Sequence, residues 1–125
     1  MHFPDLPAMP HPLQFKSVTF TALKPGPRLI VLGAVHGNEV SGSKAILKVI
    51  QEFEAGERLL QNGQVTFVPI TNPLAYNRKQ RNGDRNLNRN LTPASKPVDF
   101  EDHVANWLCP LLAAHDNCHQ LTLEK

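Results

Sequence analysis

Three segments of the chain show the hydrophobic pattern of β-strands. Over Phe15–Leu23 apolar and polar residues alternate, which predicts a strand with one exposed face. At Arg28–Leu32 the apolar run is unbroken, which is typical of a strand buried on both faces of a parallel sheet. A further apolar run predicts a third strand at Gln64–Ile70.

Two other segments follow the period of an α-helix. From Ser43 onward apolar residues recur at helical spacing, and Gly56 is a suitable stop. A strand, a helix and a strand in this order predict a crossover unit with the two strands parallel. A second helix is predicted at Asp99–Ala114 with Asp99 as its N-cap, and Pro110 inside it predicts a kink or an early end.

The remaining segments carry no regular apolar pattern. Residues Thr71–Val98 read as one long loop, which in a compact domain is usually functional or disordered. The tail, His115–Lys125, is polar and shows no strand pattern. Residues 1–14 read as a proline-rich extended arm that is neither a signal peptide nor a membrane anchor. The sequence therefore predicts one α/β domain over residues 15–125, with a partly parallel sheet flanked by helices.

Composition narrows the class of protein. The 125 residues, 41% of them hydrophobic, make at most one domain with a real core. The formal net charge of +2 is too small to favour a nucleic-acid-binding protein. No stretch approaches the roughly 20 apolar residues of a membrane-spanning helix. Cys109 and Cys118 do not suggest a disulfide framework, so we expect a reducing, cytoplasmic setting.

The first candidate site follows the buried strand directly, in the stretch His36-Gly37-Asn38-Glu39. Open α/β folds place their sites at the carboxyl ends of such strands. His36 and Glu39 are three residues apart, so a turn that enters a helix aims both at one point. An imidazole and a carboxylate are two of the three usual protein ligands of a catalytic zinc ion. The alternative is a capping carboxylate beside a surface histidine.

The second candidate site is the arginine- and asparagine-rich stretch Arg81–Arg89. Guanidinium groups bind carboxylates with two parallel hydrogen bonds, so this loop is suited to clamp a dicarboxylate substrate. The alternatives are a solvated charged loop and a loop that binds phosphate or nucleic acid. Tyr76 is the one aromatic residue nearby, so a base-stacking platform is not indicated. Asp84 is expected to form a turn rather than to act as a catalytic carboxylate.

Three motifs in order resemble a known family. They are the stretch Gly33–Glu39, the sequence Asn72-Pro73-x-Ala75, and Arg81 followed by Asn86-Leu87-Asn88-Arg89. Together they resemble the succinylglutamate desuccinylase/aspartoacylase family, which are zinc-dependent amidohydrolases related to the zinc carboxypeptidases. The resemblance covers about residues 28–112, which correspond to the amino-terminal half of that catalytic domain. It implies a zinc carboxypeptidase-like fold that is apparently truncated.

The resemblance also implies roles for particular residues. His36 and Glu39 match the first two zinc ligands of the family. Arg81 matches the catalytic arginine near the scissile carbonyl, which polarises that carbonyl and steadies the oxyanion. Asn88 and Arg89 match the pair that holds the terminal carboxylate of the substrate. In the family mechanism, zinc-activated water attacks an amide carbonyl with a glutamate as general base.

Three departures from the family concern the same chemistry. Members have a third zinc ligand, a histidine in an apolar strand after the last predicted helix. His119 stands at about the right distance and is expected to be that ligand, with Cys118 as another donor, although the residues around it are polar. No segment matches the catalytic glutamate of the family. Asn86 stands where many members carry an acidic residue.

The resemblance implies a zinc-dependent hydrolase that cleaves a small N-acyl amino acid of the N-acylaspartate or N-succinylglutamate type. No nucleic-acid or membrane partner is expected. The alternative is a catalytically incomplete fragment, or an anion-binding module, of the same family. A truncated sheet would expose an edge strand, which favours self-association as a homo-oligomer.

Overall fold

A computed structural model describes residues 14–121, so the predicted arm lies almost wholly outside the described residues. One sheet of four strands has the order β1-β3-β2-β4. The strands are β1 (Val18–Thr21), β2 (Arg28–Leu32), β3 (Gln64–Val68) and β4 (Asn117–Gln120). No helix within residues 14–121 is long and apolar enough to cross a membrane.

Strand β2 is the centre of the sheet. It runs parallel to β3 on one side and to β4 on the other, whereas β1 runs antiparallel to β3. The register pairs Leu29 with Val65 and Val31 with Phe67. The predicted parallel strand pair and the partly parallel sheet are therefore confirmed. β1 and β3 are shorter than the apolar segments that predicted them.

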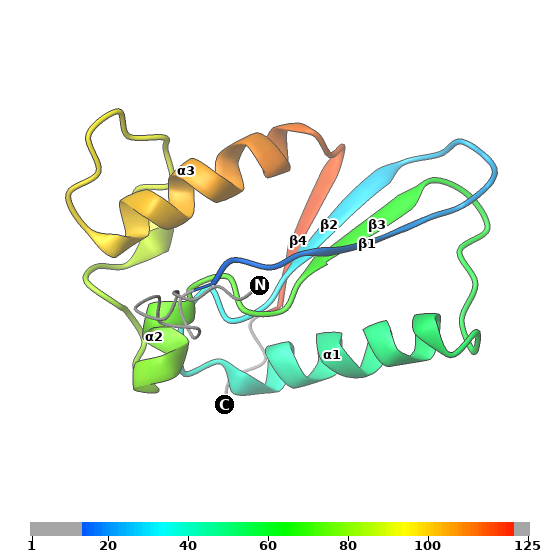
Figure 1. Ribbon diagram of the computed structural model, residues 1–125, viewed down its shortest axis with the longest axis horizontal. Coiled ribbons are helices and arrows are strands. Elements are labelled where there is room, and N and C mark those ends of the chain that lie inside the picture. Colours follow the sequence, from blue (N-terminus) through cyan, green and yellow to red (C-terminus); the bar gives the residue numbers. More distant parts are fainter. Residues whose placement is uncertain (1–13, 122–125) are drawn as a thin grey trace, which may run out of the picture.

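Helices cover both faces of this sheet. Figure 1 shows α1 (Val40–Glu54) on one face and α3 (Phe100–Ala113) on the other. The short helix α2 (Pro73–Arg78) lies beyond the carboxyl ends of β2 and β3, near the start of α1. A single turn of 3₁₀ helix, η2 (Leu87–Arg89), follows α2 in the chain. The α/β fold class predicted from the sequence is confirmed.

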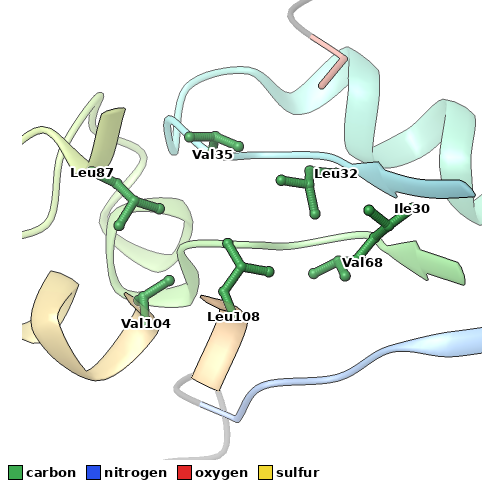
Figure 2. Close-up of a cluster of buried hydrophobic side chains, with 7 residues drawn as sticks. All are labelled: Ile30, Leu32, Val35, Val68, Leu87, Val104 and Leu108. Carbon is green, nitrogen blue, oxygen red and sulfur yellow. The ribbon is translucent and has the colours of Figure 1, made fainter. Parts of the chain in front are cut away.

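Alternate side chains of β2 enter two hydrophobic clusters. Ile30 and Leu32 pack on the α3 side, and Val31 packs on the α1 side. Figure 2 shows the α3 side, where Leu108 from α3 faces Leu32. Leu87 from η2 belongs to the same cluster, so burial of this one leucine fixes part of the second candidate loop to the core. Because both faces of β2 are buried, its unbroken apolar run is explained.

The segment Thr71–Val98 is not one long loop, so that prediction was wrong. It contains α2 and η2. Asn72 caps α2 by accepting a hydrogen bond from the Ala75 N–H at 3.2 Å, and a proline follows it at the first helical position. Helices of this length show no recognisable apolar period, which is why the pattern missed them.

The two long helices differ from their predictions at one end each. α1 begins at Val40 rather than Ser43. The N-cap of α3 is Asp99 as predicted, because its carboxylate accepts the Asp102 N–H at 2.8 Å. The helix does not end at Pro110, so the early end was wrong. Burial of Leu108 and the following leucines against the sheet offsets the hydrogen bond that Pro110 cannot donate.

The polar tail contains strand β4, which the sequence pattern did not predict. Its register pairs Cys118 with Ile30 and His119 with Val31. An edge strand needs one hydrogen-bonded neighbour only, so polar and exposed residues are acceptable in it. Just before β4, His115 is half-buried and places Nε2 2.8 Å from the Thr66 hydroxyl.

Candidate functional site

The first candidate motif lies directly after β2, and backbone hydrogen bonds from the segment after β3 hold it in place. The Thr71 N–H donates to the Gly33 carbonyl at 2.8 Å, and the Asn72 N–H donates to the Ala34 carbonyl at 3.0 Å. Ala34 has a φ of 50°, in the left-handed region that residues with a side chain rarely adopt. The chain therefore turns sharply after β2 and delivers His36 beside α2.

Gly37 lies where α2 presses against the motif. A Cβ atom at this position would overlap the backbone carbonyls of Ala75 and Gln80. The Gly37 N–H donates to the carbonyl of Arg81 at 3.1 Å. Only glycine permits this approach, which brings the start of the second candidate loop onto the first motif.

His36 and Glu39 form a buried pair. His36 Nδ1 lies 2.8 Å from Glu39 Oε2, and the two residues are 4% and 1% exposed. Glu39 Oε1 is buried without a hydrogen-bond partner among the described residues. A buried carboxylate oxygen is costly unless a donor or a cation satisfies it. Glu39 is the N-cap residue of α1 but makes no capping bond with its side chain, so the capping alternative was wrong.

Asn86 fixes the tautomer of the His36 ring. Its Oδ1 lies 2.9 Å from His36 Nε2 and also accepts the Asn88 N–H at 3.0 Å. Since a backbone N–H is always a donor, this side-chain atom is the oxygen, and Nε2 carries a hydrogen. Nδ1 is then free to hold a proton or to bind a metal ion beside Glu39. From the sequence, Asn86 was only a departure from the family motif, and its contact with His36 was not predicted.

The predicted substrate residues belong to the same region. Arg81 and Asn88 are exposed, and Arg89 closes η2. The Arg81 carbonyl binds Gly37, and the Asn88 N–H binds Asn86. The structure thus brings the Arg81 backbone against the His36 motif, whereas Asn88 is connected to it through Asn86.

Further contacts tie this loop to the start of α3. Asp84 accepts the Phe100 N–H at the start of α3 at 2.9 Å. Arg85 donates to Asp99 at 2.9 Å and to Asp102 at 3.0 Å. Hydrogen bonds from the Val98 N–H and from Arg85 hold the pKa of Asp102 below its ordinary value. Arg85 is therefore occupied by two carboxylates of the protein itself.

The donors present fit a zinc ion in part. His36 Nδ1 and the Glu39 carboxylate are of the types that bind zinc in proteins. A cation at this place would also satisfy the unpartnered Glu39 oxygen. Within residues 14–121 no three side chains of His, Cys, Asp or Glu are grouped so as to hold a metal ion.

The structure does not bring His119 to this pair. It is exposed and lies beside Val31, whereas His36 follows the end of β2. Desolvation raises the pKa of the Cys118 thiol, which disfavours the thiolate that zinc prefers.

The chain is similar in sequence to a known family of proteins. Residues 25–107 match the model of the succinylglutamate desuccinylase/aspartoacylase catalytic domain. A probable aspartoacylase of Prochlorococcus marinus subsp. pastoris is 33% identical over 81 residues, which cover 65% of this chain and 26% of that protein.

Solved structures share the fold. An aspartoacylase family protein of Mesorhizobium loti is 25% identical with a TM-score of 0.70, over 84% of this chain and 33% of the other. A succinylglutamate desuccinylase/aspartoacylase of Rhodobacter sphaeroides is 25% identical with a TM-score of 0.67, over 83% and 32%. A product-bound ectoine utilization protein of Ruegeria pomeroyi has a TM-score of 0.69 at 22% identity, over 83% and 31%. The chain thus spans about a quarter to a third of the length of these relatives.

Proposed function

The chain belongs to the succinylglutamate desuccinylase/aspartoacylase family, and from that premise we propose that it contributes to a zinc-dependent amidohydrolase. Members of this family are hydrolases that remove an acyl group. The reaction proposed is cleavage of the amide bond of an N-acyl amino acid, of the N-acylaspartate or N-succinylglutamate type.

The observation that carries this proposal is the buried His36–Glu39 pair. His36 Nδ1 and the Glu39 carboxylate would hold the zinc ion, and the unpartnered Glu39 Oε1 would gain a ligand bond there. When bound, zinc would lower the pKa of a water molecule enough for that water to act as a nucleophile toward a carbonyl near neutral pH. Asn86 keeps the His36 ring oriented for this by accepting its Nε2 hydrogen.

The second candidate loop would bind the substrate. Arg81 is proposed to polarise the scissile carbonyl, because its backbone is bound to Gly37 beside His36. Asn88 and Arg89 are proposed to hold the terminal carboxylate. Arg85 is not assigned to substrate, since Asp99 and Asp102 already neutralise it.

A second candidate is a catalytically incomplete module that binds carboxylates without turnover. The observation in its favour is that the described residues assemble two zinc donors and no third. Catalytic zinc sites normally use three protein ligands and a water. His119 as the third ligand stays a prediction, and its exposed position beside Val31 does not favour it.

Zinc stoichiometry and affinity of the full chain test the proposal, measured beside His36→Ala, Glu39→Ala and His119→Ala. One zinc per chain that is lost in the first two variants is the expected result. Retention in His119→Ala would exclude His119 as a ligand, and loss in it would identify the third ligand. Absence of zinc binding, or zinc that survives His36→Ala, would contradict the proposal.

Hydrolysis of N-succinylglutamate and of an N-acylaspartate by the zinc-loaded chain separates the two candidates. Turnover that Arg81→Ala abolishes would support the amidohydrolase. Binding of a dicarboxylate without turnover would support the incomplete module. If the chain instead binds a nucleic acid, and if this binding weakens steeply with added salt and is not competed by dicarboxylates, the loop is a nucleic-acid-binding loop.

A cytoplasmic setting is proposed as well. Cys109 and Cys118 are both free thiols, and burial raises the pKa of the Cys109 thiol.

A further inference from the structure

A buried carboxylate outside the two candidate motifs is Glu101, in the first turn of α3. Its exposed fraction is 0%. Oε2 accepts from the side-chain amide of Asn72 at 2.8 Å and from the Gly83 N–H at 3.0 Å. Oε1 accepts from the N–H groups of Asp84 and Arg85, both at 3.1 Å. Within residues 14–121 no basic side chain pairs with Glu101, so these N–H donors stabilise the charged carboxylate.

Gly83 is adapted to this contact. A Cβ atom on Gly83 would lie 2.7 Å from Glu101 Oε2 and 2.9 Å from Leu74 Cδ2. A residue without a side chain is therefore needed where the loop backbone meets the carboxylate. A glutamate that merely favours the dipole of α3 would need neither this approach nor four donors.

The other anchors of the loop Arg81–Arg89 include the Arg81 carbonyl bound to Gly37 and the side-chain contacts of Asp84, Arg85 and Asn86 described above. Leu87 is buried in the α3-side cluster, whereas Arg81, Asp84 and Asn88 are exposed. The ion pairs of Arg85 are partly exposed, so water competes for them. Glu101 differs from Arg85 and Asp84 in being fully buried, and it binds three successive backbone N–H groups of this loop.

Glu101 also reaches the other side of the candidate site through Asn72. The Asn72 N–H binds Ala34, directly after β2, and its Oδ1 caps α2. On the loop side, the N–H of Arg85 is bound by Glu101, and the next residue is Asn86. One carboxylate therefore joins the turn that carries His36 to the loop that carries its partner.

We propose that Glu101 is a positioning residue: its carboxylate fixes the backbone of residues 83–85, so that Asn86 meets and orients the His36 ring. Glu101 acts through Asn86 and contributes no atom to the reaction. The inference rests on the proposed function, in which the oriented His36 Nδ1 binds zinc.

The variant Glu101→Gln, compared with Asp102→Asn in the full chain, tests this. The glutamine keeps the shape but turns an NH₂ donor toward N–H donors. The matched Asp102→Asn variant alters a partner of Arg85 in the same helical turn and leaves the Glu101 contacts intact.

Three changes are expected in Glu101→Gln and not in Asp102→Asn. The amides of residues 83–85 exchange with solvent about tenfold faster for each hydrogen bond lost. In the metal-free protein, the ¹⁵N spectrum of the His36 ring loses the signature of a fixed Nε2–H tautomer. The dissociation constant for zinc rises about 10- to 100-fold.

A folded Glu101→Gln chain with unchanged amide exchange and an unchanged His36 ring would overturn the inference, as would equal effects of Asp102→Asn. If Glu101→Gln does not fold, Gly83→Ala displaces the loop from the same carboxylate and must produce the same changes in amide exchange and in the His36 ring spectrum. If the unaltered chain binds no zinc, the proposed function fails, while the metal-free measurements still decide the role of Glu101.

Discussion

At the residue scale, the chemistry depends on the two ring nitrogens of His36. Each faces an oxygen, Glu39 Oε2 at 2.8 Å and Asn86 Oδ1 at 2.9 Å. Asn86 is a neutral acceptor, so it orients the ring but draws the Nε2 hydrogen less strongly than a carboxylate would. The affinity of Nδ1 for the proposed zinc ion is therefore expected to respond to this one residue.

Replacement of Asn86 tests that dependence. Asn86→Asp should bind zinc more tightly than the unaltered chain, because a charged acceptor makes the His36 ring a stronger donor to the metal. Asn86→Ala should bind it about 10- to 100-fold more weakly. Competition with a chromophoric chelator measures both. Asn90→Ala, which removes a contact with Thr92 only, is the control, and an Asn86→Ala chain equal to it would contradict the prediction.

Gly37→Ala should destabilise the fold, because its Cβ would overlap the backbone of Ala75 and Gln80. The expected loss is about 3 kcal/mol in the free energy of unfolding by urea. Gly56→Ala is the control: its Cβ meets nothing within 4 Å, although its φ of +80° is left-handed. The control should lose only about 1 kcal/mol. Equal losses in the two variants would mean that α2 yields to the new methyl group.

At the scale of elements, β4 is the strand whose presence least follows from its own residues. It pairs with β2 along one edge, and three of its four residues are exposed. Arg28 provides a second attachment just before it. The Arg28 guanidinium donates to Asp116 Oδ1 at 3.2 Å, and the Arg28 N–H donates to Asp116 Oδ2 at 2.8 Å. These hydrogen bonds lower the pKa of Asp116.

The contacts of Asp116 should make the free energy of unfolding depend on pH in the acidic range. The pKa of this carboxylate is lower in the folded state than in the unfolded state. It therefore stabilises the fold fully above its ordinary pKa, and this stabilisation is lost as the pH falls through the lower, folded-state pKa. The difference in unfolding free energy between the unaltered chain and Asp116→Asn should thus be constant near neutrality and shrink below about pH 4. Urea unfolding from pH 7 to pH 2.5 measures it. A difference that stays constant to the lowest pH would contradict the assignment.

At the scale of the whole molecule, one sheet joins two hydrophobic clusters. The α3-side cluster contains Ile30 and Leu108, and the α1-side cluster contains Val31 and Ile46. Because neighbouring residues of β2 enter opposite clusters, loss of either cluster exposes a face of the same strand. Both helices are therefore expected to unfold together.

Leu108→Ala should lower the free energy of unfolding by about 2–5 kcal/mol, since this fully buried side chain fills the space between α3 and the sheet. Leu47→Ala is the control, because Leu47 is 44% exposed and should change stability by no more than about 0.5 kcal/mol. Trp107 fluorescence reports α3, and far-ultraviolet circular dichroism reports both helices. Transitions at different urea concentrations would contradict the single cooperative unit.

The elements that could be predicted from the amino-acid sequence are those whose residues are buried and periodic. The unbroken apolar run of β2 and the alternation around Val18–Thr21 identified strands, and the helical stripes identified α1 and α3. The same local reading found His36, Glu39 and Arg81 as candidates, because their residue types and spacing are those of a known motif. A hydrophobic pattern predicts these elements because apolar residues recur on the face of each element that is buried from water.

Only the tertiary structure decided the rest, because the rest depends on partners far away in the chain. β4 is a strand because β2 offers it an edge, and α2 forms because Asn72 caps it beside β2. Asn86 reaches His36 across fifty positions, and Glu101 binds three N–H groups that precede it by sixteen to eighteen. The partner of a buried polar residue cannot be predicted from periodicity, because its hydrogen bond depends on a single donor or acceptor that the fold brings close.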